Sequence, residues 1–170
     1  MRRSRIVRPR KRAIWVNVPF GQIAFTEAVG TQLLLTPEDW EAQFSGQANE
    51  TAVLRAIVGD VCVQQTVVGT AGNVIQWGVY IADKDSTVPP VFTAVGLADY
   101  DWLHMGAVGV AGTLVTATTA APTSSIHVRI KSKRRLRSRD AVYICAQCNT
   151  DAVSPAGTIG GVLRFLVARD

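Results

Sequence analysis

The sequence is poor in the residues that build metal centres and disulfide frameworks. Its 170 residues include three cysteines and two histidines. An odd number of cysteines disfavours a disulfide framework and is compatible with a reducing compartment. Cys145 and Cys148 have the spacing of a zinc or redox motif, but residues three apart in a strand point to opposite faces. We therefore expect buried thiols, and neither a metal nor another cofactor.

Long apolar runs are also missing. Asn17, Pro19 and Gln22 interrupt the most hydrophobic N-terminal stretch, and a membrane-spanning helix needs about 18 consecutive apolar residues. Hydrophobic residues make up 48% of the chain and charged residues 18%, with a mean hydropathy of +0.17. This composition excludes a wholly disordered chain and is sufficient for one domain with a substantial core.

Catalytic motifs are absent as well. His104 and His127 are the only histidines, and neither lies in a nucleophile elbow, a zincin helix or a phosphate-binding glycine loop. The sequence therefore predicts no enzymatic activity. Four aspartates could gather around a calcium ion, although paired aspartates in loops more often cap and turn the chain. These aspartates are Asp83, Asp85, Asp99 and Asp101.

Basic residues, by contrast, are concentrated in two places. The chain has 18 Lys and Arg against 13 Asp and Glu, and seven of the basic residues lie in residues 1–12 and seven in residues 129–139. Such polarisation predicts a polyanionic partner bound at defined places. Residues 1–12 contain no acid and include Pro9, which predicts a disordered arm. A single domain over residues 13–170 should follow it.

Residues 13–170 are dominated by strand-forming segments. These segments are rich in Val, Ile, Thr and aromatic residues and are bounded by Gly, Pro, Asn or Asp. They cover residues 14–25, 29–36, 53–68, 74–83, 111–119, 126–132, 141–147 and 162–168. Eight strands joined by several long loops predict an all-β fold, and the eight-stranded antiparallel jelly-roll sandwich matches this count.

Two connections between the strands have their own signatures. Thr36 is a good N-cap, Pro37 suits the first helical position, and Trp40 and Phe44 lie four residues apart. This pattern predicts one short connecting helix. The connection over residues 82–106 is too long for a hairpin and carries several aromatic residues, so we expect it to pack as an ordered loop.

The basic run between Ile126 and Asp140 has a period of two. Basic residues alternate with an apolar set that includes Val128, Ile130 and Leu136. In an extended strand the charges would share one face while the apolar residues reach the core. An edge strand needs only one or two charges to prevent aggregation, so this stripe favours polyanion binding. We predict sequence-independent nucleic-acid binding by Arg2, Arg3, Arg5, Arg8, Arg10, Lys11, Arg12, Arg129, Lys131, Lys133, Arg135, Arg137 and Arg139.

Other functions are compatible with parts of this pattern. The basic N-terminus could be a nuclear-import signal or a mitochondrial transit peptide. Another possibility is a non-assembling single-stranded nucleic-acid-binding β-barrel, such as an OB-like module or a chaperone, in which aromatic residues should accompany the charges. Neither basic cluster contains Phe, Tyr or Trp. A β-sandwich enzyme such as a cupin would need His and Glu ligands that the sequence lacks.

Three features together resemble the coat proteins of small icosahedral viruses. They are the N-terminus MRRSRIVRPRKR, the Val-rich strands, and the segment VRIKSKRRLRSRDAVYICAQ. The resemblance is to single jelly-roll subunits, particularly the short capsid proteins of circular single-stranded DNA viruses and of plant satellite viruses. It implies a closed shell of about sixty copies, an inward-facing arm that binds packaged viral genomic nucleic acid, no catalysis and no membrane.

The same resemblance implies a location in the virion, and in the host nucleus or cytoplasm during assembly. Large aromatic residues would then be candidates for contacts between subunits, or else for the core of each subunit. These candidates are Trp40, Trp77, Phe92 and Trp102.

Overall fold

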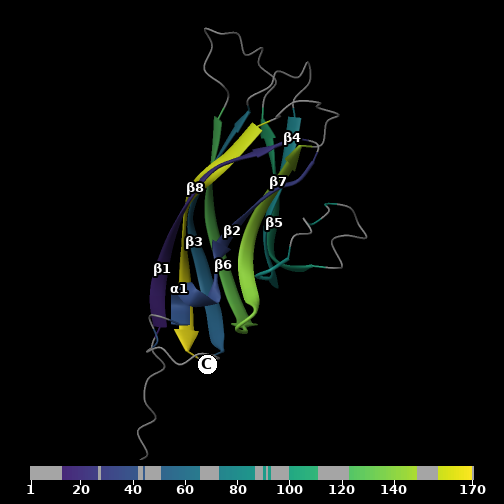
Figure 1. The fold of residues 1–170 in the computed structure, drawn as a ribbon. Coiled ribbons are helices and arrows are strands. Elements are labelled where there is room, and N and C mark those ends of the chain that lie inside the picture. The colour runs from purple at the N-terminus through teal and green to yellow at the C-terminus, as the bar shows by residue number, and fades with distance from the viewer. Residues whose placement is uncertain are drawn as a thin grey trace, which may run out of the picture.

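The chain forms a sandwich of two antiparallel four-stranded sheets in a computed structural model (Figure 1). The structure describes residues 13–26, 28–41, 44, 51–65, 73–86, 90, 92, 100–110, 123–148 and 157–169. Sheet I has the order β1 (Ala13–Phe25), β8 (Gly157–Arg169), β3 (Ala52–Gln65) and β6 (Thr123–Leu136). Sheet II has the order β2 (Gly30–Leu35), β7 (Asp140–Cys148), β4 (Asn73–Asp83) and β5 (Asp101–Val110).

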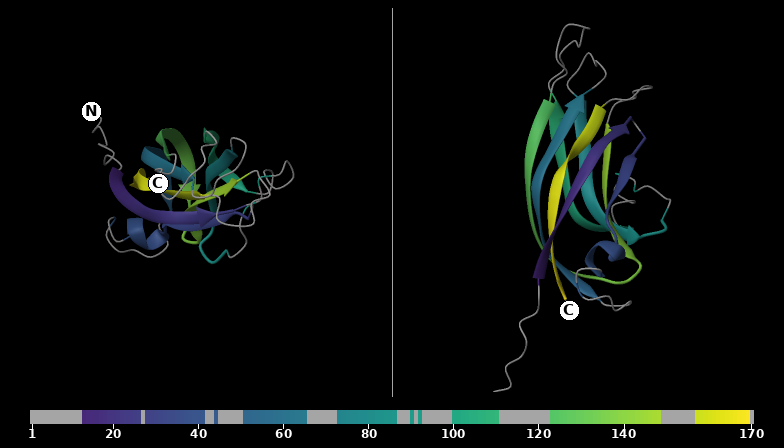
Figure 2. Two further views of the ribbon diagram at one scale, coloured as in Figure 1. Left: turned by 90° about the horizontal axis from the view of Figure 1, so that it is seen from above. Right: turned by 60° about the vertical axis from the view of Figure 1, so that its left-hand side comes forward.

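The strand order is that of a jelly roll. Apart from β4 and β5, which pair directly, every two consecutive strands lie in opposite sheets. The chain therefore crosses repeatedly between the two layers, which Figure 2 shows face to face. This confirms the predicted all-β jelly-roll sandwich, whereas an OB fold is a five-stranded barrel.

Alternating side chains build the core between the sheets. In β3, for example, Ile57, Val61 and Val63 are fully buried, while Asp60 and Cys62 on the other phase are exposed. The same alternation recurs in β1 and β6, because one face of each strand meets the other sheet while the opposite face is exposed. The central strand β7 differs, because six consecutive residues from Ala141 to Ala146 are buried.

The predicted helix is confirmed as α1 (Pro37–Glu41). The Asp39 carboxylate accepts hydrogen bonds from both the backbone N–H and the hydroxyl of Thr36, at 2.7 and 3.0 Å. These bonds satisfy a donor at the helix start, as in a capping box. Trp40 of α1 and Phe44, which follows the helix, are both buried in the core, so this segment packs against the sandwich.

The fifth strand lies earlier in the chain than predicted. Residues 101–106, which we expected in the long loop, belong to β5, while the strand predicted at 111–119 lies outside the described residues. β5 contains His104, Met105, two glycines and few β-branched residues, so its local preference for a strand is weak. Its pairing with β4 from Asn73 to Ile81 determines its conformation.

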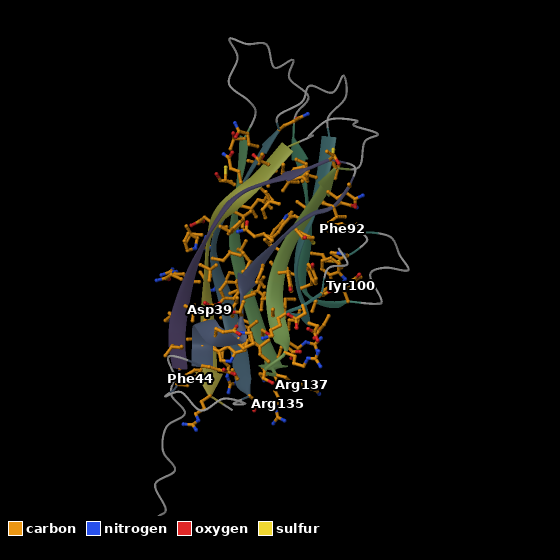
Figure 3. The ribbon with its side chains drawn as sticks, in the orientation of Figure 1. Asp39, Phe44, Phe92, Tyr100, Arg135 and Arg137 are labelled. Carbon is orange, nitrogen blue, oxygen red and sulfur yellow. The ribbon has the colours of Figure 1, made fainter. Side chains whose placement is uncertain are left out.

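A second, smaller aromatic cluster covers the outer face of sheet II. Tyr80 and Tyr143 stack with ring centroids 5.4 Å apart, and Trp102 packs 5.5 Å from Tyr80. Phe92 and Tyr100, labelled in Figure 3, both contact Trp102. The described part of the 82–106 connection therefore packs against the sheet.

The aromatic residues proposed as subunit contacts divide into two groups. Trp40 and Trp77 are almost fully buried within the core, so they cannot reach a second subunit. Phe92 and Trp102 are half-buried in the outer cluster of sheet II.

Candidate nucleic-acid interface

Charge is segregated between the two sheets. The four strands of sheet I contain eight basic residues and a single acidic residue, Asp60. The four strands of sheet II contain three acidic residues and no Lys or Arg. The two sheets therefore differ in charge, and among the described strands the excess of positive charge lies on sheet I.

Strand β6 carries most of this positive charge at the edge of sheet I. Val128, Ile130 and Leu136 are buried on the inner face, as the period-two pattern predicts. The alternate residues are exposed on the outer face; they are His127, Arg129, Lys131, Lys133 and Arg135. The predicted stripe is thus confirmed as a geometric feature over these five positions.

Arg134 belongs to the inner phase of β6 but does not enter the core. It pairs in register with Leu54, next to a register shift between Leu54 and Ala56, and β6 and β5 are each the edge strand of their sheet. Its guanidinium lies 2.6 Å from the Asp101 carboxylate at the start of β5. Arg134 therefore links the edges of the two sheets and is already paired with an acid.

The stripe ends earlier than the sequence suggested. β6 stops at Leu136, and residues 137–139 form the turn into β7. In this turn the Arg137 N–H donates to the Asp140 carboxylate at 2.8 Å, and the Arg139 Nε lies 3.3 Å from Asp83 of sheet II. Arg137 and Arg139 are exposed, but they are not part of the strand stripe, because the chain reverses there.

Strand register places the stripe relative to the rest of sheet I. One row across the four strands is Ala13, Ala168, Val53 and Arg135. Ala13 follows directly on residues 1–12, so the chain enters the sheet at the level of Arg135. Figure 3 shows Arg135 and Arg137 at this lower end of the sandwich, where β8 also ends. The seven basic residues at positions 2–12, which we predicted to bind nucleic acid, lie outside the described residues.

The one acid of sheet I is engaged by a neighbour on β6. The Asp60 Oδ1 lies 2.9 Å from His127 Nδ1, and both side chains are exposed. Among the described residues no carboxylate pairs with Arg129, Lys131, Lys133 or Arg164. These four cations remain available to an external anion.

Sequence reasoning missed two residues on this face. Trp15 of β1 is 51% exposed, and the Arg164 guanidinium of β8 lies 5.8 Å from the centre of its ring. Both residues lie on the outer face of sheet I, the same face that carries the β6 stripe. The alternation of Ile14, Val16 and Val18 could have signalled that Trp15 points away from the core.

The described members of the four aspartates considered as possible calcium ligands have other partners. Asp83 and Asp101 each pair with an arginine, Asp85 donates its N–H to the Asp83 carboxylate at 3.0 Å, and Asp99 lies outside the described residues. Among the described residues, no three His, Cys, Asp or Glu side chains form a group that could hold a metal.

None of the three cysteines forms a disulfide. Cys148 is buried in the main core, whereas Cys145 is buried in the outer cluster of sheet II, so the two point to opposite faces, as expected. Burial raises the pKa of Cys145 to about 12, which keeps it protonated and unreactive. Cys62, in contrast, is exposed on sheet I, so the expectation of buried thiols is wrong for this residue.

Among the described residues, the structure contains no helix with the length and apolar character of a membrane span.

The fold and this face define a class: an eight-stranded jelly roll with one basic and one acidic sheet. No protein-family model matches the sequence, and no curated protein matches it. Among solved structures, a chain from tobacco necrosis virus is similar over 94% of this chain and 95% of its own, with 13% identity and a TM-score of 0.41.

Two further chains are similar at the same level. One from cocksfoot mottle virus matches 94% of this chain and 95% of its own, with 10% identity and a TM-score of 0.47. One from turnip yellow mosaic virus matches 99% of this chain and 86% of its own, with 13% identity and a TM-score of 0.38. At these values the likeness carries no argument about function, and the strand order itself defines the fold.

Proposed function

We propose that this protein is the coat protein of a small icosahedral virus, and that sheet I and the N-terminal arm bind the packaged nucleic acid. The observation that carries the proposal is the segregation of charge. The strands of sheet I contain eight Lys and Arg residues and one acid, whereas the strands of sheet II contain no Lys or Arg. A shell subunit needs this polarity, because one surface must meet a polyanion while others meet copies of the same chain.

The arm suits the packaging role for an electrostatic reason. A shell of about sixty subunits with seven arm charges each would offer roughly 420 positive charges to the enclosed phosphates. Release of condensed counterions would drive binding without any fixed register. The arm joins the sheet at the level of Arg135, so the two basic regions would act on the same nucleic acid.

The assembly state of the purified full-length chain tests this proposal. We expect closed particles by negative-stain microscopy and an early-eluting species in size-exclusion chromatography, with nucleic acid that co-purifies. A chain that stays an 18.3 kDa monomer at high concentration, or a small oligomer that binds nucleic acid, would contradict the shell and favour the non-assembling alternative.

Removal of residues 1–12 separates packaging from folding. We expect the shortened chain to keep its far-UV circular dichroism and unfolding midpoint while losing most of the co-purifying nucleic acid. The matched control is the full-length chain with the seven arm cations replaced by Gln, which should behave like the deletion. Undiminished nucleic acid in both variants would contradict the role of the arm.

A further inference from the structure

We propose that Trp15 and Arg164 form a stacking platform on sheet I for a base of single-stranded nucleic acid. This inference rests on the nucleic-acid half of the proposed function and specifies its ligand. It predicts that the protein binds single-stranded nucleic acid more tightly than a duplex. The two basic clusters alone do not predict this preference.

The platform is formed by neighbouring strands. Trp15 lies on the outer face of β1 and is 51% exposed, the largest value among the exposed large hydrophobic side chains of the described residues. Arg164, on β8, holds its guanidinium 5.8 Å from the ring centre. Because the guanidinium lies over the ring, a base would stack on the part of the indole that it leaves exposed, and the guanidinium would pair with the phosphate of the same nucleotide.

The same face connects the platform to the β6 stripe. Trp15 shares a row with Leu166, Ala56 and Lys131, and the adjacent row joins Arg164 to Arg129. Neighbouring strands lie about 4.8 Å apart, so about 14 Å separates Trp15 from Lys131 along the row. A single-stranded nucleic acid with stacked bases covers this distance with about four nucleotides, and an extended one covers it with fewer. A short segment could therefore stack on Trp15 and reach the β6 stripe.

The surface between Trp15 and Lys131 is compatible with a bound single-stranded nucleic acid. Leu166, Ala56 and Val58 are half-buried and project little from the sheet. The one acid of sheet I, Asp60, lies in the row of His127 and is paired with it. Within the described part of the chain, a nucleic acid that crosses from Trp15 to Lys131 therefore meets cations and apolar surface but no unpaired carboxylate.

A second protein copy fits this face less well. The other strongly exposed apolar residue of sheet I, Val162, is separated from the row of Trp15 by the row that holds Arg164 and Arg129. An apolar interface over both residues would bury these two arginines without a carboxylate partner from the same face, which is costly. The charge of the face favours a polyanion.

The test compares single-stranded and duplex DNA of one sequence, about ten nucleotides long, by fluorescence anisotropy with the full-length chain at several salt concentrations. For Trp15→Ala we expect about tenfold weaker binding to the single strand, within the range of one lost base–aromatic stack. The salt dependence should not change, because no phosphate contact is removed. Duplex binding should also not change, since paired bases are not available for stacking.

Two controls separate stacking from other roles of Trp15. Trp15→Phe retains an aromatic ring and should recover most of the affinity, while quenching of tryptophan emission by the oligonucleotide should disappear. Met105→Ala removes an apolar side chain that is 46% exposed on sheet II, and it should change nothing. Circular dichroism of each variant verifies the fold, and Trp15→Phe keeps the test valid if Trp15→Ala unfolds.

The outcomes distinguish this inference from the proposed function. Equal single-strand affinity for the wild-type chain and a folded Trp15→Ala variant would overturn the platform, while strong salt-dependent binding by both would leave the packaging role intact. Absence of nucleic-acid binding by every protein would contradict both proposals. Loss of assembly in Trp15→Ala with normal single-strand affinity would make Trp15 a contact between copies and overturn the platform.

Discussion

His104 is a titratable side chain whose environment opposes its charged form. It lies on β5 opposite Val79 of β4, with its ring 4.9 Å from the ring of Trp77. Partial burial lowers the pKa of His104 below its ordinary value. The unfolded chain, in which the imidazole is hydrated, therefore binds a proton more readily than the folded one.

This difference predicts a pH-dependent stability. The contribution of His104 is fully present above the unfolded pKa, about 6.5, and is lost as the pH falls below that value toward the lower folded pKa. We expect the urea unfolding midpoint to decrease between pH 7.5 and pH 5, and His104→Gln to decrease less. Other groups titrate in both proteins, so the difference between them isolates His104. An identical decrease would contradict the prediction.

At the scale of elements, the central pair of sheet I depends on close backbone approach. A Cβ on Gly59 of β3 would lie 2.1 Å from the Val162 carbonyl oxygen, and a Cβ on Gly161 of β8 would lie 2.2 Å from that of Asp60. Gly161 also has a φ of 157°, and the register between β1 and β8 shifts immediately beyond it. The two strands can pair here only because both positions lack a side chain.

Gly161→Ala is therefore expected to destabilise the fold. The unusual φ alone costs an alanine about 1–3 kcal/mol, and the contact with the Asp60 carbonyl adds to this. The matched control is Gly109→Ala on the edge strand β5, where a Cβ would meet nothing within 4 Å, so stability should change little. Urea unfolding monitored by tryptophan fluorescence measures both. Equal stability of the two variants would show that the β3–β8 pair tolerates a side chain.

At the scale of the whole molecule, the two sheets divide two tasks. Among the described residues, Arg129, Lys131 and Lys133 of β6 and Arg164 of β8 have no carboxylate partner, whereas Arg139 pairs with Asp83 and Arg134 with Asp101, both acids of sheet II. Pairing reduces the charge that an external phosphate experiences. The number of counterions released on binding should therefore depend on the number of unpaired cations more than on the total number of basic residues.

The salt dependence of binding tests this division. Replacement of Arg129, Lys131 and Lys133 by Gln should reduce the slope of log affinity against log salt for a single strand by about 2, at roughly 0.7 per phosphate contact. The control replaces Lys84 and Arg139, which pair with Glu38 and Asp83, and should change the slope little. An unchanged slope in the triple variant would reduce the stripe to a solvated strand face.

Much of this architecture could be predicted because the relevant signals are local. The alternation of Val128, Ile130 and their charged neighbours requires an extended strand with one basic face, and Thr36 and Pro37 mark the start of α1. The weak strand preference of residues 101–106 gave no such signal, because pairing with β4 decides their conformation. The end of the stripe at Leu136 was also missed, since a turn stabilised by Asp140 interrupts the period.

The sequence by itself determined the all-β class, the phase of β6 and the concentration of charge, because strand period and composition depend only on near neighbours. Tertiary structure alone decided that Trp15 and Arg164 join the face of the stripe, and that sheet I is basic while sheet II is acidic. These properties depend on which distant strands pair and in what register. Such pairing is the outcome of packing the whole core, and no single segment encodes it.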